Sequence, residues 1–218
     1  MYYGCMPENI PPTSELVQTL DEIISLGDMA LRLGREDRIT LHPDGVMSES
    51  VTDHTIMLSV IACSLAARYA PDMDIGRVAQ FALVHDFPEV YAGDTPTLTI
   101  SEEERQQKET REAEALERID SELPRLNWLT DTVRRYETLE DKEARFVKAL
   151  DKLMPTITHI LNKGAYIHRE GYDIGRMSEI FADQPQEMRP FTHDQELVLI
   201  IRELLVDRAI EEIFPSED

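Results

Sequence analysis

The sequence contains little cysteine, no long hydrophobic run and few basic residues for its length. Only Cys5 and Cys63 stand among 218 residues, so no disulfide framework is expected to support the fold. No apolar stretch approaches the roughly 20 residues that cross a bilayer, which argues against a membrane partner. The N-terminal residues MYYGCMPENIPPTSE lack a basic region followed by an apolar one. We therefore expect no signal peptide and a cytoplasmic protein.

The shortage of basic residues makes the chain strongly acidic. There are 22 Lys and Arg residues against 43 Asp and Glu, which gives a net charge of −21. A surface of this kind repels polyanions, so we expect no nucleic-acid partner. A single nucleotide remains a possible substrate, because a bound metal and a few local cations can hold one phosphate. The composition, with 42% hydrophobic and 30% charged residues, is typical of a soluble globular domain, here spanning residues 1–218.

The hydrophobic pattern is helical nearly throughout, and no stretch alternates with period two for long enough to predict a sheet. The sequence therefore predicts an all-α fold of about seven helices. Capping boxes at Ser101 with Glu104 and at Thr192 with Gln195 mark two helix starts. The expected helices cover residues 14–33, 52–70, 74–87, 102–123, 130–164 with a kink or break at Pro155, 173–182 and 193–213. Residues 35–51, which include Pro43, Gly45 and several polar residues, are expected to form a loop.

A histidine and an aspartate, His85 and Asp86, end an apolar helical segment. Imidazole nitrogens and carboxylate oxygens are good ligands for a divalent cation. Antiparallel packing of the helices 52–70 and 74–87 would bring His54, at the start of the first, beside His85. Asp151 lies in the apolar segment VKALDKL, where an unpaired carboxylate is costly. Each residue is weak evidence by itself, because a buried histidine is more often a core residue, but the four together favour a metal site.

His54, the run HDFPEVYAGDTPT from His85 onwards and the segment EARFVKALDKL resemble the HD-domain phosphohydrolase superfamily, and within it the 5′-deoxynucleotidase branch. The similarity covers roughly residues 14–163. The resemblance implies an HD-domain helical bundle and one divalent metal cation (manganese, cobalt, zinc or magnesium). It implies these metal ligands: His54, His85, Asp86 and Asp151. Residues 165–218 are expected to form a helical extension that packs on the bundle or makes a dimer contact.

Further site residues follow from the same resemblance. Glu89 is expected to be a catalytic acid or base, and Asp94 matches a second acidic active-site residue of the branch. Arg38 matches an arginine that contacts the nucleotide. The branch usually follows this arginine with a tryptophan, whereas Ile39 stands here. The preference for deoxyribose over ribose therefore stays open.

Other cations and the single tryptophan are interpreted from their positions. Lys152 follows Asp151 directly, so it is a candidate contact for a substrate phosphate. Lys108 and Arg111 are expected to form salt bridges on a charged surface helix. Trp128 is expected in the core or in an interface rather than as a platform for a base.

The resemblance implies hydrolysis of deoxynucleoside 5′-monophosphates to nucleoside and phosphate. It also implies that the chain self-associates as a dimer. A metal in such a site lowers the pKa of bound water toward roughly 7 and offsets charge on the phosphoryl group. One alternative is a deoxynucleoside triphosphate triphosphohydrolase, which needs more cations than we count near the site. A second alternative is an inactive HD bundle that binds a nucleotide or a protein. A metal-free acidic scaffold would leave His54 and Asp151 far from His85.

Overall fold

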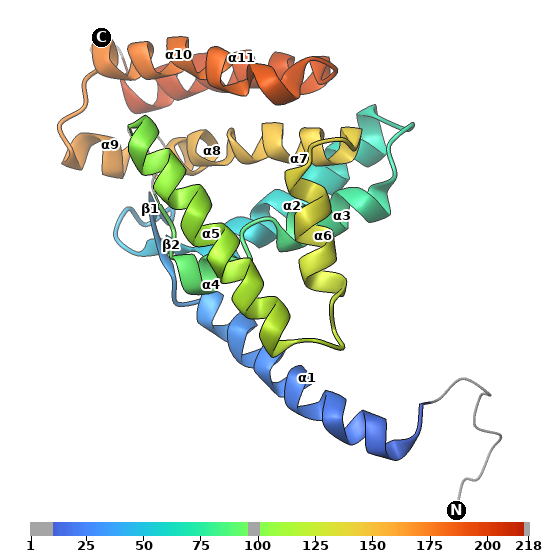
Figure 1. Cartoon of the computed structure of the whole chain (residues 1–218). Coiled ribbons are helices and arrows are strands. Elements are labelled where there is room, and N and C mark those ends of the chain that lie inside the picture. The colour runs from blue at the N-terminus through green and yellow to red at the C-terminus, as the bar shows by residue number, and fades with distance from the viewer. Residues whose placement is uncertain (1–10, 96–100, 216–218) are drawn as a thin grey trace, which may run out of the picture.

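The computed structural model describes residues 11–95 and 101–215, and its arrangement is shown in Figure 1. Helices dominate, and the all-α prediction is confirmed apart from one small hairpin. The elements are α1 (Thr13–Leu33), β1 (Asp37–Leu41), β2 (Ser48–Ser50), α2 (Val51–Tyr69), α3 (Ile75–Val84), α4 (Glu89–Ala92), α5 (Glu102–Glu122), α6 (Trp128–Glu137), α7 (Lys142–Asp151), α8 (Met154–Leu161), α9 (Ala165–Arg169), α10 (Ile174–Thr192) and α11 (Glu196–Ile213).

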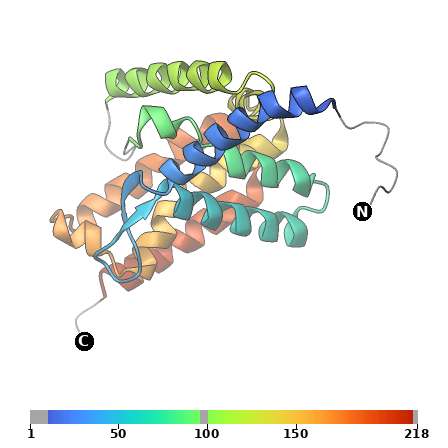
Figure 2. The same cartoon turned by 90° about the horizontal axis from the view of Figure 1, so that it is seen from below.

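The centre of the bundle is formed by α2, α3 and α7, which pack against one another. Their apolar side chains meet in one cluster with residues of α10 and α11, and it includes the fully buried Leu58, Phe81, Phe146 and Leu150. Helices α10 and α11 run side by side along one edge of the molecule (Figures 1 and 2). Because α11 also packs against α8, the C-terminal helices cover the side of the bundle that carries the end of α7.

The hairpin corrects the prediction that residues 35–51 form a loop. Strands β1 and β2 pair antiparallel, with Asp37 opposite Ser50 and Leu41 opposite Ser48. Its turn is closed by Asp44, whose carboxylate accepts from the backbone N–H groups of residues 46 and 47. Strands of five and three residues are too short to give a period-two signal, so the sequence pattern could not reveal them. The hairpin leads directly into α2.

Several helix boundaries differ from the predicted ones. The expected helix 130–164 is divided into α6, α7 and α8, and Pro155 lies in the first turn of α8 instead of kinking a continuous helix. The expected helix 173–182 continues to Thr192 as α10, through two prolines, because Met188 and Phe191 pack into the core. The capping box at Ser101 is confirmed. The one at Thr192 is wrong, since the hydroxyl of Thr192 donates to the Met188 carbonyl.

Some apolar side chains stay at the surface. Trp128 is 50% exposed, so its expected place in the core is wrong, and the interface alternative stays a prediction. Helix α1 extends away from the bundle (Figure 1), and Leu20, Ile23 and Ile24 are exposed on it. The predicted self-association stays a prediction as well. Within the described ranges, no helix is both long and apolar enough to cross a bilayer.

Asn162, at the end of α8, connects strand β1 of the hairpin to α8 and α9 through hydrogen bonds. Its side-chain amide donates to the Leu41 carbonyl at 2.7 Å, and its oxygen accepts from the Ala165 N–H at 3.1 Å. We expect Asn162→Ala to lower the free energy of unfolding by about 1–3 kcal/mol, because the buried Leu41 carbonyl loses its side-chain donor and the Ala165 N–H loses one of its two acceptors. Urea denaturation measures this change. Asn127→Ala, at an exposed asparagine, serves as the control; equal small effects in the two variants would contradict the assigned role.

Candidate metal centre

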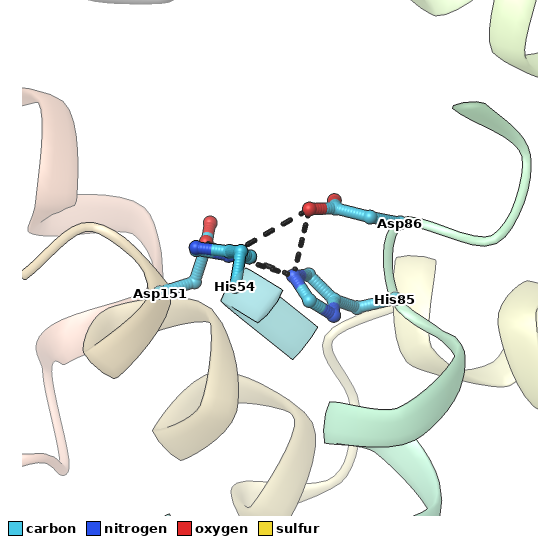
Figure 3. A group of neighbouring side chains, drawn as sticks. All are labelled: His54, His85, Asp86 and Asp151. Atoms are coloured by element: carbon cyan, nitrogen blue, oxygen red, sulfur yellow. Dashed lines mark hydrogen bonds and ion pairs between the residues drawn. The ribbon is translucent and has the colours of Figure 1, made fainter. Parts of the chain in front are cut away.

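His85 and Asp86 lie where α3 gives way to a series of tight turns. His85 is the C-cap of α3, and its backbone N–H still bonds to the Phe81 carbonyl. The chain then turns twice, with N–H donation from Phe87 to Val84 and from Glu89 to Asp86, before α4 begins. Neighbouring side chains of a regular helix diverge by about 100°. The turns after Val84 instead let His85 and Asp86 face the same point (Figure 3).

The other two residues of the cluster come from α2 and α7. His54 lies in the first turn of α2, whose start is fixed by a capping box between Ser50 and Asp53. Asp151 is the last residue of α7, directly before the break that separates it from α8. The packing of α2 against α3 and α7 brings these ends together. The predicted proximity of His54 and His85 is therefore confirmed.

The four side chains converge closely, as Figure 3 shows. His54 Nε2 lies 2.9 Å from Asp151 Oδ1 and 3.3 Å from His85 Nε2. His85 Nε2 lies 3.0 Å from Asp86 Oδ2. One ligand atom from each residue lies within 4.8 Å of all the others. These distances exclude the metal-free scaffold that would hold His54 and Asp151 far from His85.

The donor set fits a divalent cation. His85 Nδ1 lies 2.9 Å from the Ala82 carbonyl, which can only accept, so Nδ1 carries a proton and Nε2 is the ring nitrogen that faces the cluster. Bonds of about 2.1 Å place neighbouring ligand atoms of a coordination shell about 3 Å apart, as found here. Burial lowers the pKa of His85, but the charges of Asp86 and Asp151 outweigh it and raise the pKa to about 10. The cluster thus attracts positive charge strongly.

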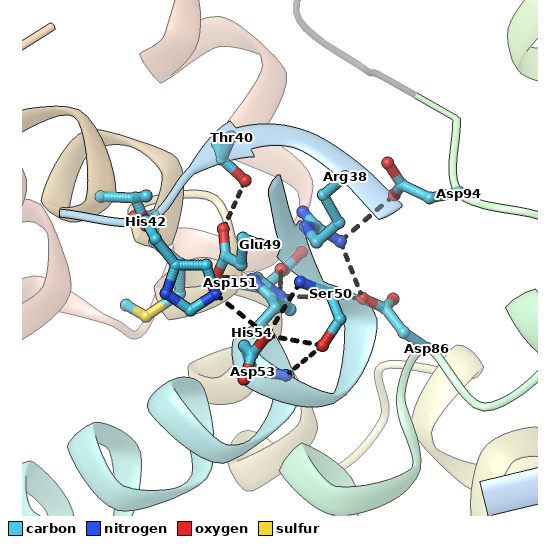
Figure 4. A network of polar contacts seen from close by, with 12 residues as sticks. Arg38, Thr40, His42, Glu49, Ser50, Asp53, His54, Asp86, Asp94 and Asp151 are labelled. Atoms are coloured by element: carbon cyan, nitrogen blue, oxygen red, sulfur yellow. Dashed lines mark hydrogen bonds and ion pairs between the residues drawn. The ribbon is translucent and has the colours of Figure 1, made fainter. Parts of the chain in front are cut away.

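Glu49, on β2, supports His54 from the side away from the cluster (Figure 4). Its Oε1 lies 3.8 Å from His54 Nδ1, and its Oε2 accepts a hydrogen bond from the Thr40 hydroxyl. Both Glu49 and Thr40 are buried. A carboxylate behind a metal-binding histidine orients the ring and increases its basicity. Sequence reasoning missed this residue, because it lies in the segment that was expected to be a loop.

Beside the cluster opens a cavity of about 500 Å³, counting the open space at its mouth, and the predicted site residues line it together with Asp86 and Asp151. Arg38 Nη1 lies 3.4 Å from Asp86 Oδ2 and 3.2 Å from Asp94 Oδ1. Glu89 is 2% exposed. Among the described residues, Arg38 Nε and Glu89 Oε2 are buried polar atoms without a hydrogen-bond partner. Buried atoms of this kind are rare in native proteins and point to a ligand that satisfies them.

The acidic residues of the cavity have shifted pKa values. Burial raises the pKa of Glu89 well above its usual value, and the charges of Asp86 and Asp94 raise it further against the opposing effect of Lys108. Burial also raises the pKa of Asp94, although Arg38 counteracts it. Two carboxyl groups with raised pKa values beside a cluster that attracts a cation are typical of acid–base sites.

Two lysines complete the cavity wall. Lys152 lies there as expected, and burial lowers its pKa. Lys108 was expected to be a surface salt-bridge residue; it does pair with Glu112 at 3.2 Å, but its Nζ also lies 3.5 Å from Glu89 Oε1 inside the cavity. Its position gave a usable signal, since residues 108, 112, 115 and 119 follow one face of α5, and Ala115 and Ile119 are buried. Arg111 donates to the hydroxyl of Thr95 at 2.8 Å.

We expect Glu49→Gln to weaken the binding of a divalent metal by about tenfold, because His54 loses the charge that orients its ring. Calorimetric titration of chelator-stripped protein with Mn²⁺ measures the affinity. Glu170→Gln is the matched control, at an exposed carboxylate that lies near Arg169 and does not line the cavity. An unchanged affinity in Glu49→Gln, or an equal loss in the control, would contradict the assigned role.

Comparison with known proteins agrees with this geometry. The family model described as HD domain matches residues 31–190. The human protein 5′-deoxynucleotidase HDDC2 is 32% identical over 74% of this chain and 73% of its own length. A solved structure from Magnetospirillum magnetotacticum, described as a predicted metal-dependent phosphohydrolase, superposes with a TM-score of 0.70 at 26% identity and covers 89% of this chain and 96% of its own.

A conserved hypothetical protein from Pyrococcus furiosus has the same fold, with a TM-score of 0.57 at 23% identity over 85% of this chain and 98% of its own. The extent of the family match and the identity to the human relative go well beyond the short motifs around His85. The matched residues 31–190 include the hairpin with Arg38 and the helices α2, α3, α7 and α8, all of which contribute to the site. The chain therefore belongs to the HD-domain family of phosphohydrolases.

Proposed function

We propose that the protein removes the 5′-phosphate from deoxynucleoside monophosphates, with a divalent metal held by His54, His85, Asp86 and Asp151. The observation that carries the proposal is the convergence of these four side chains beside a cavity that is lined by both acidic and basic groups. The relatives named 5′-deoxynucleotidase support the choice of substrate. A bound divalent cation would activate water and polarise the phosphoryl group.

Arg38 binds and orients the substrate in this proposal. Its guanidinium is fixed by Asp86 and Asp94, and its buried Nε has no partner among the described residues. A phosphate oxygen would supply the missing acceptor with a charge-assisted hydrogen bond. Asp94 holds the arginine with one carboxylate oxygen and offers the other to a water molecule or a sugar hydroxyl. Ile39 lines the same cavity, in place of the family's tryptophan.

Glu89 supplies the proton for the leaving group. Burial and the neighbouring carboxylates hold its pKa high, so it retains a proton to higher pH than an ordinary glutamate. Its unpartnered Oε2 is the atom available to donate. When water attacks phosphorus and the bond to the nucleoside 5′ oxygen breaks, this proton passes to the departing oxygen. The two products are nucleoside and phosphate, and Glu89 regains a proton from solvent.

Lys108 and Lys152 provide the positive charge that the acidic sequence otherwise lacks. Both line the cavity, together with Arg38. Lys108 reaches it from α5 and Lys152 from the break after α7, so the cations surround the space beside the metal ligands. Three cations are more than the sequence suggested. They suit one phosphate and also keep the triphosphohydrolase alternative open to test.

We expect chelator-stripped protein to release phosphate from deoxynucleoside monophosphates only after manganese, cobalt, magnesium or zinc is added. Phosphate and triphosphate release from deoxy and ribo forms of nucleoside mono- and triphosphates measures both activity and preference. Asp86→Ala should abolish the activity, because it removes one of the four proposed ligands.

Triphosphate release, lost in the same variant, would instead assign the protein to the triphosphohydrolases. No turnover of any nucleotide with any of the four metals would contradict the proposed function and leave the inactive binding bundle as the better description.

We expect Lys108→Met to lower kcat/KM for the monophosphate by about 10- to 100-fold, because a charge-assisted contact to the phosphate is lost. Inhibition by inorganic phosphate should weaken by a similar factor, which a purely structural role would not produce. Lys163→Met, at an exposed lysine paired with Glu212 outside the cavity, is the control. Unchanged phosphate inhibition in Lys108→Met would remove this residue from the substrate site.

A further inference from the structure

A second cavity adjoins the one beside the metal ligands. It encloses about 950 Å³ including its open mouth, and it shares four lining residues with the first: Arg38, Asp151, Lys152 and Pro155. The two are therefore parts of one continuous depression. The first part collects the metal ligands and the cations, whereas the second extends away from them, between α8 and α10.

The walls of the second cavity differ in character from those of the first. From α10, Met177, Ile180 and Phe181 contribute apolar side chains to it, beside the polar side chains of Arg176, Asp183, Gln184 and Glu187. Thr156 and His159 of α8 line the opposite side with polar atoms. A flat heteroaromatic base has apolar faces and a polar edge, so it suits a space lined by both apolar and polar side chains.

His159 adds an unsatisfied group to this cavity. The side chain is 4% exposed, and its Nδ1 has no hydrogen-bond partner among the described residues. The ring is stacked on Tyr166, with centroids 6.1 Å apart, which fixes its plane. Burial lowers the pKa of His159 to about 4, so the imidazole is neutral near pH 7. A neutral, fixed imidazole that lacks a partner is a suitable hydrogen-bonding group for the edge of a base.

The α10 wall is held in place before any ligand binds. Gln184 donates from Nε2 to the Lys152 carbonyl at 3.0 Å, and its Oε1 accepts from Arg202 Nε of α11 at 3.0 Å. Arg202 is buried and also donates to the Phe181 carbonyl. These bonds connect α10 both to the residue after Asp151 and to α11. Such preorganisation reduces the entropy lost on binding.

We propose that the cavity between α8 and α10 is the nucleoside subsite, in which the base of the nucleotide packs against Met177 and Ile180 and meets His159 at its edge. The proposal rests on the proposed function, because it assumes that the phosphate lies in the cavity beside the metal ligands. In this proposal helix α10, whose last part was not predicted from the sequence, is the element that selects the base.

Methyl NMR tests this placement without any turnover. In protein labelled at methionine and isoleucine methyl groups, deoxyadenosine should shift the signals of Met177 and Ile180, whereas 2-deoxyribose, which lacks the base, should not. Neither probe carries a phosphate, so hydrolysis cannot interfere. Shifts confined to residues outside the α8–α10 cavity, no shifts with deoxyadenosine, or equal shifts with both probes would overturn the proposal.

A cavity-filling variant tests the same subsite by kinetics. Ile180→Trp should raise KM for deoxyadenosine monophosphate by about tenfold and change kcat/KM for 2-deoxyribose 5-phosphate by less than about threefold, because only the base is displaced. Ile174→Trp is the matched control, at an exposed isoleucine of α10 that does not line the cavity. Equal losses on the two substrates, or no loss on either, would count against the subsite.

The two proposals fail in different ways. If the wild-type protein hydrolyses neither phosphate ester, the proposed function is wrong, and the methyl shifts with deoxyadenosine still decide whether the cavity binds a nucleoside. If the wild-type protein hydrolyses the nucleotide while the methyl signals of Met177 and Ile180 stay fixed, the proposed function stands and the subsite is wrong.

Discussion

Four candidate ligand atoms converge on one point at the centre of this site: two imidazole nitrogens and two carboxylate oxygens, one each from His54, His85, Asp86 and Asp151. They come from the start of α2, the turn after α3 and the end of α7, so the mutual packing of these three helices brings the four atoms together. Atoms so rich in lone pairs repel one another unless positive charge lies between them. The local irregularities of the chain follow from this constraint, because the turn after Val84 and the break after Asp151 both aim side chains into the cluster.

The surroundings of the cluster reconcile an acidic protein with a phosphate substrate. The chain carries a net charge of −21, yet Arg38, Lys108 and Lys152 lie together around a single cavity. Carboxylates hold two of these cations in place, since Arg38 lies between Asp86 and Asp94 and Lys108 contacts Glu89 and Glu112. Interactions between charges in a partly buried cavity are screened far less than those at the surface. A few local cations can therefore outweigh the repulsive field of the whole molecule.

Much of this arrangement was predictable from the sequence, because the motif residues sit in apolar helices whose pattern is strong. The proximity of His54 to His85 followed from the antiparallel packing of two adjacent helices. The hairpin was not predictable, since its strands are too short for a periodic signal, and Glu49 was missed with it. Lys108 was interpreted as a surface residue because α5 is highly charged, although the buried face that Lys108 continues was visible at Ala115 and Ile119. The length of α10 depends on tertiary packing that outweighs two internal prolines.

Anomalous diffraction from crystals grown with Mn²⁺ measures the position of the metal directly. We expect one strong anomalous peak within about 2.0–2.3 Å of His54 Nε2, His85 Nε2 and a carboxylate oxygen of both Asp86 and Asp151. The same crystals of His85→Ala should lose the peak. A peak elsewhere in the molecule, or none at the four residues at a Mn²⁺ concentration that supports phosphate release, would contradict the assignment of these side chains as the metal ligands.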